Sequence, residues 1–80
     1  MIEILAYGKI TDIRYQQNVL LVTLQIAGST RSAPRRVTCV KRGKRALALK
    51  DRLRLGQQVI VRGSAICRVS KIYMNSLLVT

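Results

Sequence analysis

The first third of the chain alternates between hydrophobic and polar residues, which is typical of β-strands with one buried face. Residues Ile2–Tyr7 follow this period, and the phase then slips between Gly8 and Ile13. A bulge at or near Gly8 would bend the strand in this way. After a turn at residues 16–18, Val19–Ile26 alternates again. The pattern predicts two strands joined by a short turn. The residues of the second strand that are expected to face inward are Leu20, Val22, Leu24 and Ile26.

The middle of the chain predicts a third strand and then a helix. Residues 27–34 hold a Gly, small polar residues and the only Pro, so we expect a loop there. Arg35–Lys41 alternates as a strand, with Val37 and Cys39 inward and Arg36, Thr38 and Val40 outward. Lys44–Leu55 has no β-branched residue and is rich in good helix formers. Its apolar stripe consists of Ala46, Leu49 and Leu53, and Gly56 is the expected C-cap.

The last quarter of the chain predicts two further strands. Gln58–Gly63 alternates, with Val59, Val61 and Gly63 on one face. Between Ala65 and Thr80 we expect one reversal of the chain, placed at Met74–Ser76 or, as an alternative, at Ser70–Lys71. Leu77–Val79 is then the closing strand.

Three strands, a helix and two strands, with a bent first strand, predict an all-β fold with one short helix. This order fits the five-stranded Greek-key barrel of the oligonucleotide/oligosaccharide-binding (OB) fold. A small SH3-like barrel is the structural alternative, although it would normally lack a full helix after the third strand. The 80 residues have the length of one small domain, so we expect a single domain over residues 1–80.

Composition excludes several classes of protein. The chain is 49% hydrophobic, so it is not disordered despite a net charge of +12. It contains no run of about 18 apolar residues that could cross a membrane. Glu3 stands where a signal peptide needs positive charge. These features predict a soluble, cytoplasmic protein.

The residues needed for catalysis and for metal binding are scarce. The sequence has no His, and its three carboxylates, Glu3, Asp12 and Asp51, lie in separate segments. The five glycines do not form a phosphate-binding loop. Cys39 and Cys67 have apolar neighbours, so we interpret each as a small buried hydrophobic residue. We therefore expect no enzymatic activity, no metal site and no cofactor.

Positive charge is concentrated in one part of the chain. Ten of the 15 Lys and Arg residues fall between positions 31 and 54, together with a single acid, Asp51. This pattern could simply keep a hydrophobic protein soluble, or the segment 44–55 could lie on an anionic membrane. However, the apolar face of that helix is needed to close the barrel. The unbalanced charge instead favours a groove that binds nucleic acid.

The candidate binding residues follow from the outward positions of the strands and from the charge. In an OB barrel the ligand lies across strands two and three and the adjoining loops. Tyr7, Tyr15 and Tyr73 are the only rings that could stack on bases, and Tyr7 lies on the outward phase of the first strand. Because rings are few, binding should depend on charge more than on stacking. The predicted nucleic-acid-binding residues are Tyr7, Lys9, Arg31, Arg35, Arg36, Thr38, Lys41, Arg42, Lys44, Arg45, Arg62 and Arg68.

The segments Arg36–Val40, Gly43–Ala46 and Leu53–Gly63 together resemble bacterial single-stranded DNA-binding proteins. In that family a strand leads into a Gly-Lys-Ala helix, which is followed by a strand of the form Lys/Leu-x-Gly-x-x-Val-x-Val-x-Gly. PriB-like primosomal proteins are a shorter variation on the same plan. The resemblance implies a dimer or tetramer that binds single-stranded DNA without sequence preference in replication, recombination or repair. The chain departs from the family in having no Trp or Phe, and in having Arg35–Arg36 where an aromatic often stands.

Two alternatives remain open at this point. Small RNA-binding barrels such as translation initiation factor one have a similar length and basicity, so RNA is the alternative ligand. A purely structural subunit is the other, because Val19–Val22 is apolar on both faces and Leu77–Val79 is a second apolar run. Both runs favour self-association as a homodimer or homotetramer, whichever ligand is bound.

Overall fold

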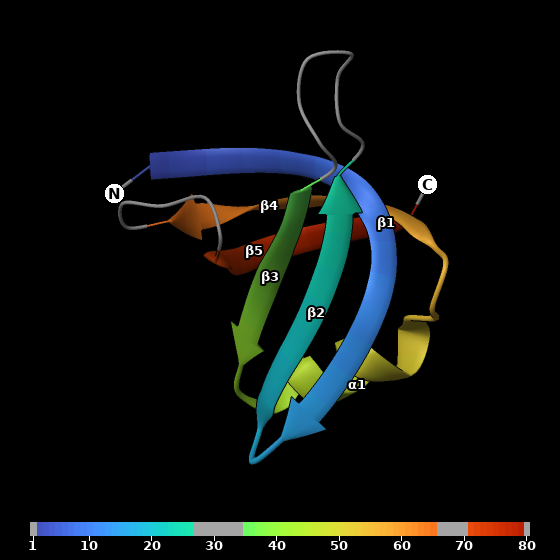
Figure 1. Cartoon of the computed structure of the whole chain (residues 1–80). Helices are drawn as coiled ribbons and strands as arrows, with labels where there is room; N and C mark the ends of the chain where they lie inside the picture. Colours follow the sequence, from blue (N-terminus) through green and yellow to red (C-terminus); the bar gives the residue numbers. More distant parts are fainter. Residues whose placement is uncertain (1, 27–34, 66–70, 80) are drawn as a thin grey trace, which may run out of the picture.

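The chain folds into a closed β-barrel with the order of elements that the sequence predicts (Figure 1). The computed structural model describes residues 2–26, 35–65 and 71–79. In these ranges the barrel order is β1-β2-β3-β5-β4, and only the β3–β5 pair is parallel. This is the five-stranded OB barrel, and the predicted fold class is confirmed. The elements are β1 (Ile2–Gln16), β2 (Val19–Ile26), β3 (Arg35–Arg42), α1 (Lys44–Arg52), β4 (Gln58–Ala65) and β5 (Lys71–Val79).

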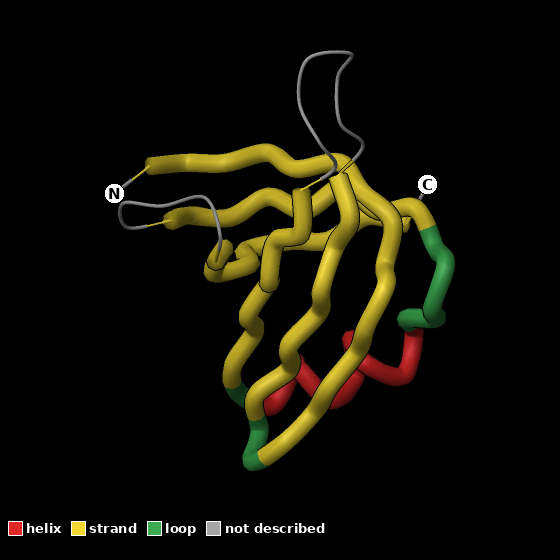
Figure 2. The backbone as a smooth tube through the Cα atoms, viewed as in Figure 1, coloured by secondary structure: helices red, strands yellow, loops and turns green. Residues whose placement is uncertain are grey.

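The long strand β1 bends and is shared between two neighbours (Figure 2). Its first half pairs with β4, and from Lys9 onward it pairs with β2. The register with β2 shifts between Ile10 and Asp12, which leaves Thr11 as an extra residue. The Thr11 hydroxyl bonds to the carbonyl oxygen of Thr23 at 3.3 Å and so satisfies a polar group at the bulge. The predicted bulge is confirmed, three residues beyond Gly8.

A turn joins β1 to β2 as predicted, but it consists of two residues rather than the three expected at 16–18, because Gln16 still pairs with Val19. Gln17 and Asn18 both have positive φ, at 52° and 64°, which matches the right-handed twist of the flanking strands. The carbonyl oxygen of Asn18 accepts a hydrogen bond of 3.1 Å from the N–H of Gly43, just before α1. The hairpin tip is therefore tied to the start of the helix.

The core consists of the inward residues of all five strands, closed at one end by α1. The predicted inward residues of β2, β3 and β4 are buried, except that Ile26 is only partly buried against the core, and Ala46 and Leu53 reach the same cluster from the helix segment. Leu49 is partly buried against it. The fully buried side chains with the largest volumes are Ile10, Leu20, Leu24, Ile72, Val22, Val37, Val59, Val61 and Cys39.

The helix is shorter than the sequence suggests. It ends at Arg52, with Leu53 in an extended conformation as C-cap, whereas the prediction extended the helix to Leu55. The extended backbone at Leu53 accompanies its burial against the core. Gly56 is not the cap. It lies in the following turn with φ of 87°, and its N–H donates to the carbonyl oxygen of Ile10 at 2.8 Å.

The reversal predicted at Met74–Ser76 is wrong, because β5 continues through it. Arg62 pairs with Ser76 and Gly63 pairs with Met74, so Asn75 is the extra residue of a bulge. Two exposed polar residues in succession resemble a turn in sequence but here mark this irregularity. β4 ends at Ala65 and β5 begins at Lys71, and the alternative reversal at Ser70–Lys71 falls partly outside the described residues.

Val40 was predicted to be outward and available to a ligand, but only 3% of it is exposed. It is not part of the core cluster, so its outward phase holds. However, its register partners are Leu21 on β2 and Tyr73 on β5, and both are partly buried. These larger neighbours flank Val40 on the outer face and leave little of it for a ligand.

Candidate nucleic-acid interface

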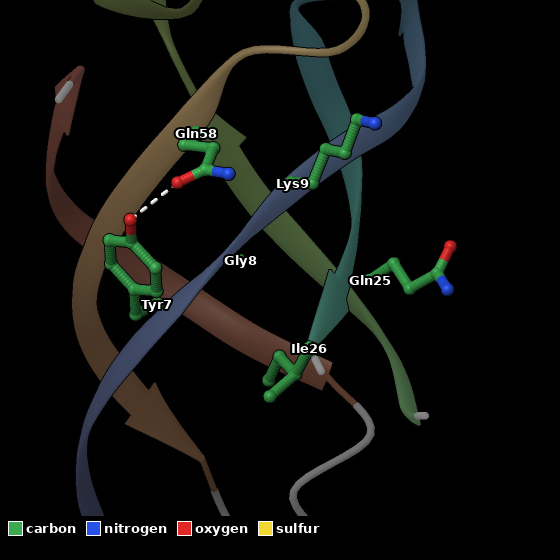
Figure 3. A pocket seen from close by; sticks show the side chains of 6 residues that line it. All are labelled: Tyr7, Gly8, Lys9, Gln25, Ile26 and Gln58. Atoms are coloured by element: carbon green, nitrogen blue, oxygen red, sulfur yellow. Dashed lines mark hydrogen bonds between the residues drawn. The ribbon is translucent and has the colours of Figure 1, made fainter. Parts of the chain in front are cut away.

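A pocket of about 500 Å³ lies where β1 leaves β2 and continues along β4 (Figure 3). β1 and β2 approach closely at this point, since a Cβ on Gly8 would lie 3.0 Å from the carbonyl oxygen of Gln25. In the described structure, no residue of β1 that precedes Lys9 pairs with β2, so the two strands diverge there. The pocket is lined by Tyr7, Gly8, Lys9, Gln25, Ile26 and Gln58.

The pocket combines a ring, an ammonium group and two side-chain amides. Tyr7 is 54% exposed, and its hydroxyl donates a hydrogen bond to Oε1 of Gln58, which holds the ring beside β4 (Figure 3). Lys9 is exposed on the same strand, and Gln25 is exposed on β2. An exposed ring can stack on an unpaired base, and a nearby ammonium can contact a phosphate. The chemistry of the pocket therefore suits a nucleotide.

A row of outward residues continues from the pocket across the barrel. Lys9 pairs with Gln58 on one side and with Gln25 on the other, and Gln25 pairs with Arg36. One step further along β3, Thr38 pairs with Thr23 and Lys71. Lys9, Arg36 and Lys71 thus supply cations on one face, in two adjacent rows. We call these five residues the pocket face: Tyr7, Lys9, Gln25, Arg36 and Lys71.

The structure brings together four of the predicted binding residues on or beside the pocket face: Tyr7, Lys9, Arg36 and Thr38. Arg35 is exposed but points to the opposite side of β3 from Arg36, because its register partner is the inward Ile26. Arg31 and Arg68 lie outside the described residues.

The other predicted cations are not part of this face. Lys41, Arg42, Lys44 and Arg45 lie at the end of the barrel that α1 closes. Arg36 and Arg42 are six residues apart on β3, which corresponds to about 20 Å at roughly 3.3 Å per residue. Arg62 lies on β4 beside Glu3, with its Nη2 atom 3.7 Å from the carboxylate. The single cationic groove expected from the sequence is therefore divided.

Sequence reasoning missed Gln58 and Lys71 as members of the site. Gln58 is the first outward residue of β4, but its place beside Lys9 depends on the register between two strands that are far apart in sequence. Lys71 was assigned to a possible turn, whereas it begins β5 and lies opposite Thr38. Its Nζ atom lies 5.9 Å from the centre of the Tyr73 ring. The outward position of Gln58 in the alternating pattern could have identified it as a candidate binding residue. No feature of the sequence identified Lys71.

The described residues offer little that resembles a catalytic or metal site. Burial raises the pKa of the Cys39 thiol to about 12, so the group is neutral and a poor nucleophile at neutral pH. Within the described ranges, no three His, Cys, Asp or Glu side chains gather as metal ligands. Cys67 falls outside those ranges. α1, the helix of the described chain, is too short to span a bilayer.

The fold resembles three solved structures over nearly its whole length. One is the SSB domain of a protein from Synechococcus sp., at 24% identity and a TM-score of 0.77, with 96% of this chain and 93% of that chain covered. Another is a small single-stranded DNA-binding protein from Streptomyces coelicolor, at 16% identity and a TM-score of 0.72, with coverage of 99% and 92%. The third is PriB from Ralstonia solanacearum, at 15% identity and a TM-score of 0.66, with coverage of 98% and 97%.

No family model and no curated protein sequence matches the chain. At these identities the solved structures establish the fold, and the resemblance seen in the sequence is confirmed at that level. The chain therefore has the OB fold in the form shared by an SSB domain, a small single-stranded DNA-binding protein and PriB.

Proposed function

We propose that residues 1–80 act as one nucleic-acid-binding domain that binds single-stranded DNA largely without sequence specificity. The observation that carries this proposal is the pocket face, where an exposed ring and a cation lie on the outward face of β1 and a row of outward residues continues to Arg36. The three solved structures with this fold, described as an SSB domain, a single-stranded DNA-binding protein and PriB, support it. Such a protein would act in the cytoplasm, in replication, recombination or repair.

The proposed contacts divide between one base and the backbone. An unpaired base stacks on Tyr7, while Lys9, Arg36 and Lys71 contact phosphates along the row that leads away from it. A duplex keeps its bases stacked inside, so it cannot place one on Tyr7 without paying for unpairing. Cations on phosphates position the strand but do not identify its bases, so sequence preference should be slight.

Affinity for single-stranded DNA should fall steeply with salt. If Lys9, Arg36 and Lys71 each neutralise one phosphate, log K falls with log salt at a slope of about −2.1, since each contact with a single strand contributes about −0.7. Fluorescence titrations with a thymidine oligomer at several salt concentrations measure this slope. A slope near zero would contradict the proposed charge-based binding.

The same titrations with duplex DNA and with RNA of matched length test the choice of ligand. We expect single-stranded DNA to compete better than duplex, because only unpaired bases can reach Tyr7. RNA differs locally by its 2′-hydroxyl, so competition between matched DNA and RNA oligomers separates the two ligands. If RNA binds more tightly than DNA, RNA is the ligand. If duplex DNA competes equally well, stacking of an unpaired base on Tyr7 does not contribute to binding.

We also propose that the chain self-associates through an apolar face on β1, β4 and β5. Leu5 is 74% exposed and Leu78 is 65% exposed, and Ile60 pairs directly with Leu78. We call Leu5, Ile60 and Leu78 the apolar face. Glu3 and Arg62 lie beside it and could pair between copies. The other apolar run considered from the sequence is less available, because the outward Val19 and Leu21 are already partly buried within the chain.

The variant Leu78→Glu should therefore be a monomer where the unchanged protein is a dimer or tetramer. Burying a Leu side chain contributes about 1.5–3 kcal/mol, and in a symmetric dimer each substitution acts twice. Sedimentation or light scattering at micromolar concentration measures the change. Leu55→Glu is the matched control, because Leu55 is 67% exposed but lies after α1 and outside the apolar face. If both variants keep the assembly, the interface lies elsewhere.

A further inference from the structure

The end of the barrel that α1 closes carries a second concentration of positive charge. Its single acid is Asp51, and no ion pair joins that acid to a cation in the described part of the chain. The ion pairs there, Arg14–Asp12 and Arg62–Glu3, both involve acids of β1. We call this region the helix-end surface, and its seven cations are Lys41, Arg42, Lys44, Arg45, Lys50, Arg52 and Arg54.

Folding alone does not account for this charge. Lys50 and Arg52 lie in the last turn of α1, where a helix favours cations. Lys44 and Arg45 begin the helix, and its first turn holds no acid, which is the reverse of the favoured arrangement. Seven cations around a nine-residue helix also repel one another. A polyanion bound from outside would remove both costs.

Along β2 and β3, the helix-end surface is separate from the pocket face. Hydrogen bonds fix the helix segment across the barrel end, from Gly43 to the hairpin at Asn18 and from Gly56 to Ile10. Arg42, at this end of β3, lies about 20 Å along the strand from Arg36 of the pocket face. The outer face between them carries uncharged residues on β2 and β3: Leu21, Thr23, Thr38 and Val40. No cation of β2 or β3 bridges the gap there.

The two surfaces also differ in chemistry. On the pocket face an exposed ring can take a base out of reach of a complementary strand. Near α1 the ring is Tyr15, which is partly buried against the core with the Lys50 Nζ atom 5.5 Å from its centre. The helix-end surface can therefore hold phosphates while the bases of that strand stay free to pair.

We propose that one copy of this chain binds two unpaired strands at once, one on the pocket face and one on the helix-end surface, and so promotes annealing of complementary strands. The proposal rests on the proposed function, since the first strand is held by the pocket face. Neutralising both backbones lowers their mutual repulsion, and holding them on one small protein raises their effective concentration. Bases of the second strand remain exposed, so pairing can begin there.

The test compares annealing rates of two complementary strands of about 30 nucleotides, labelled with a fluorophore and a quencher, a length that exceeds the site of one OB barrel. We expect the unchanged protein to accelerate annealing by about tenfold or more, as two neutralised backbones require. Arg45→Gln/Arg52→Gln should lose most of this acceleration and still bind a short thymidine oligomer at the pocket face, which contains neither residue. Gln preserves helix propensity, so α1 should stay folded. The control is Arg14→Glu, which lowers the net charge by the same two units on β1 and should anneal like the unchanged protein.

The outcomes separate this inference from the proposed function. If the unchanged protein binds the thymidine oligomer but does not accelerate annealing, the inference is overturned and the proposed function stands. If the helix variant and the control anneal equally fast, bridging occurs through another surface, such as two pocket faces of a dimer, and the inference is again overturned. If no single strand binds at all, both fail.

Discussion

Replacing Lys9 and Arg36 together by Gln should weaken binding of single-stranded DNA by about a hundredfold. Each is exposed, and both pair with Gln25, so one strand of DNA can contact them together. A hydrogen bond to a charged group contributes about 1.5 kcal/mol or more, and two such losses amount to about two factors of ten. The salt slope should also become shallower by about 1.4, because two phosphate contacts disappear. Titration at several salt concentrations measures both changes.

Arg14→Glu provides the charge-matched control for this pair as well. It changes the net charge by the same two units at an exposed position, away from the pocket. General loss of positive charge would lower the affinity of both proteins alike, whereas a contact at the pocket face lowers only that of the double variant. Circular dichroism and thermal melting should be unchanged in both, since these side chains are exposed. Equal affinities would show that the strand binds somewhere other than the pocket face.

Replacing Gly63 by Ala should destabilise the fold by about 3 kcal/mol or more, since overpacking a closed interior commonly costs about 1–3 kcal/mol. A Cβ at this position would lie 2.3 Å from the carbonyl oxygen of Tyr73 and 2.7 Å from a methyl carbon of Ile72. Neither can give way easily, because Tyr73 contributes backbone of β5 and Ile72 is fully buried. A small domain has only about 5–15 kcal/mol of stability in total, so the loss is large. Urea or thermal unfolding measures it.

Two other glycines provide a graded comparison. At Gly8 the nearest atom to an added Cβ is 3.0 Å away, so Gly8→Ala should cost less than Gly63→Ala. At Gly43 nothing lies within 4 Å, and only the positive φ of 96° opposes a side chain. Gly43→Ala should therefore cost about 1–3 kcal/mol, because φ of 96° with ψ of −171° is a conformation that essentially only glycine adopts. A Gly63→Ala protein as stable as Gly43→Ala would mean that β5 can shift away from β4.

Local patterns predicted the elements whose surroundings are regular. The bounds of β2 are as predicted, because apolar inward residues recur at every second position and Gln17 and Asn18 mark the turn before it. The inward face of β4 and the apolar stripe of α1 are confirmed for the same reason. In each of these elements, the spacing of apolar residues in the sequence matches the spacing of buried residues in the structure. The neighbouring residues in the sequence are therefore enough to predict whether a residue points inward or outward.

Features that depend on pairing between distant strands were harder to predict. The bulge at Asn75 lies opposite Arg62 and Gly63 on β4, so it depends on the pairing of the two strands, and its polar residues resemble those of a turn. Val40 has an outward phase, but the strands beside it decide that it is covered. The cations between positions 31 and 54 are close together in sequence. In the structure, however, the start of β3 lies at one end of the barrel, and the end of β3 and α1 lie at the other. Sequence alone showed how much charge there is but not that it forms two surfaces.

The sharing of β1 between two partners has a consequence for how the barrel comes apart. Its first half pairs with β4 and its second half with β2, so detachment of this one strand would break two strand pairs of the closed barrel. The backbone amides of β1 that donate hydrogen bonds to β4 or β2 should then exchange with solvent deuterium only through rare global opening, at one common rate on both sides of the bend. The strand that shapes the pocket would therefore also keep the whole barrel closed.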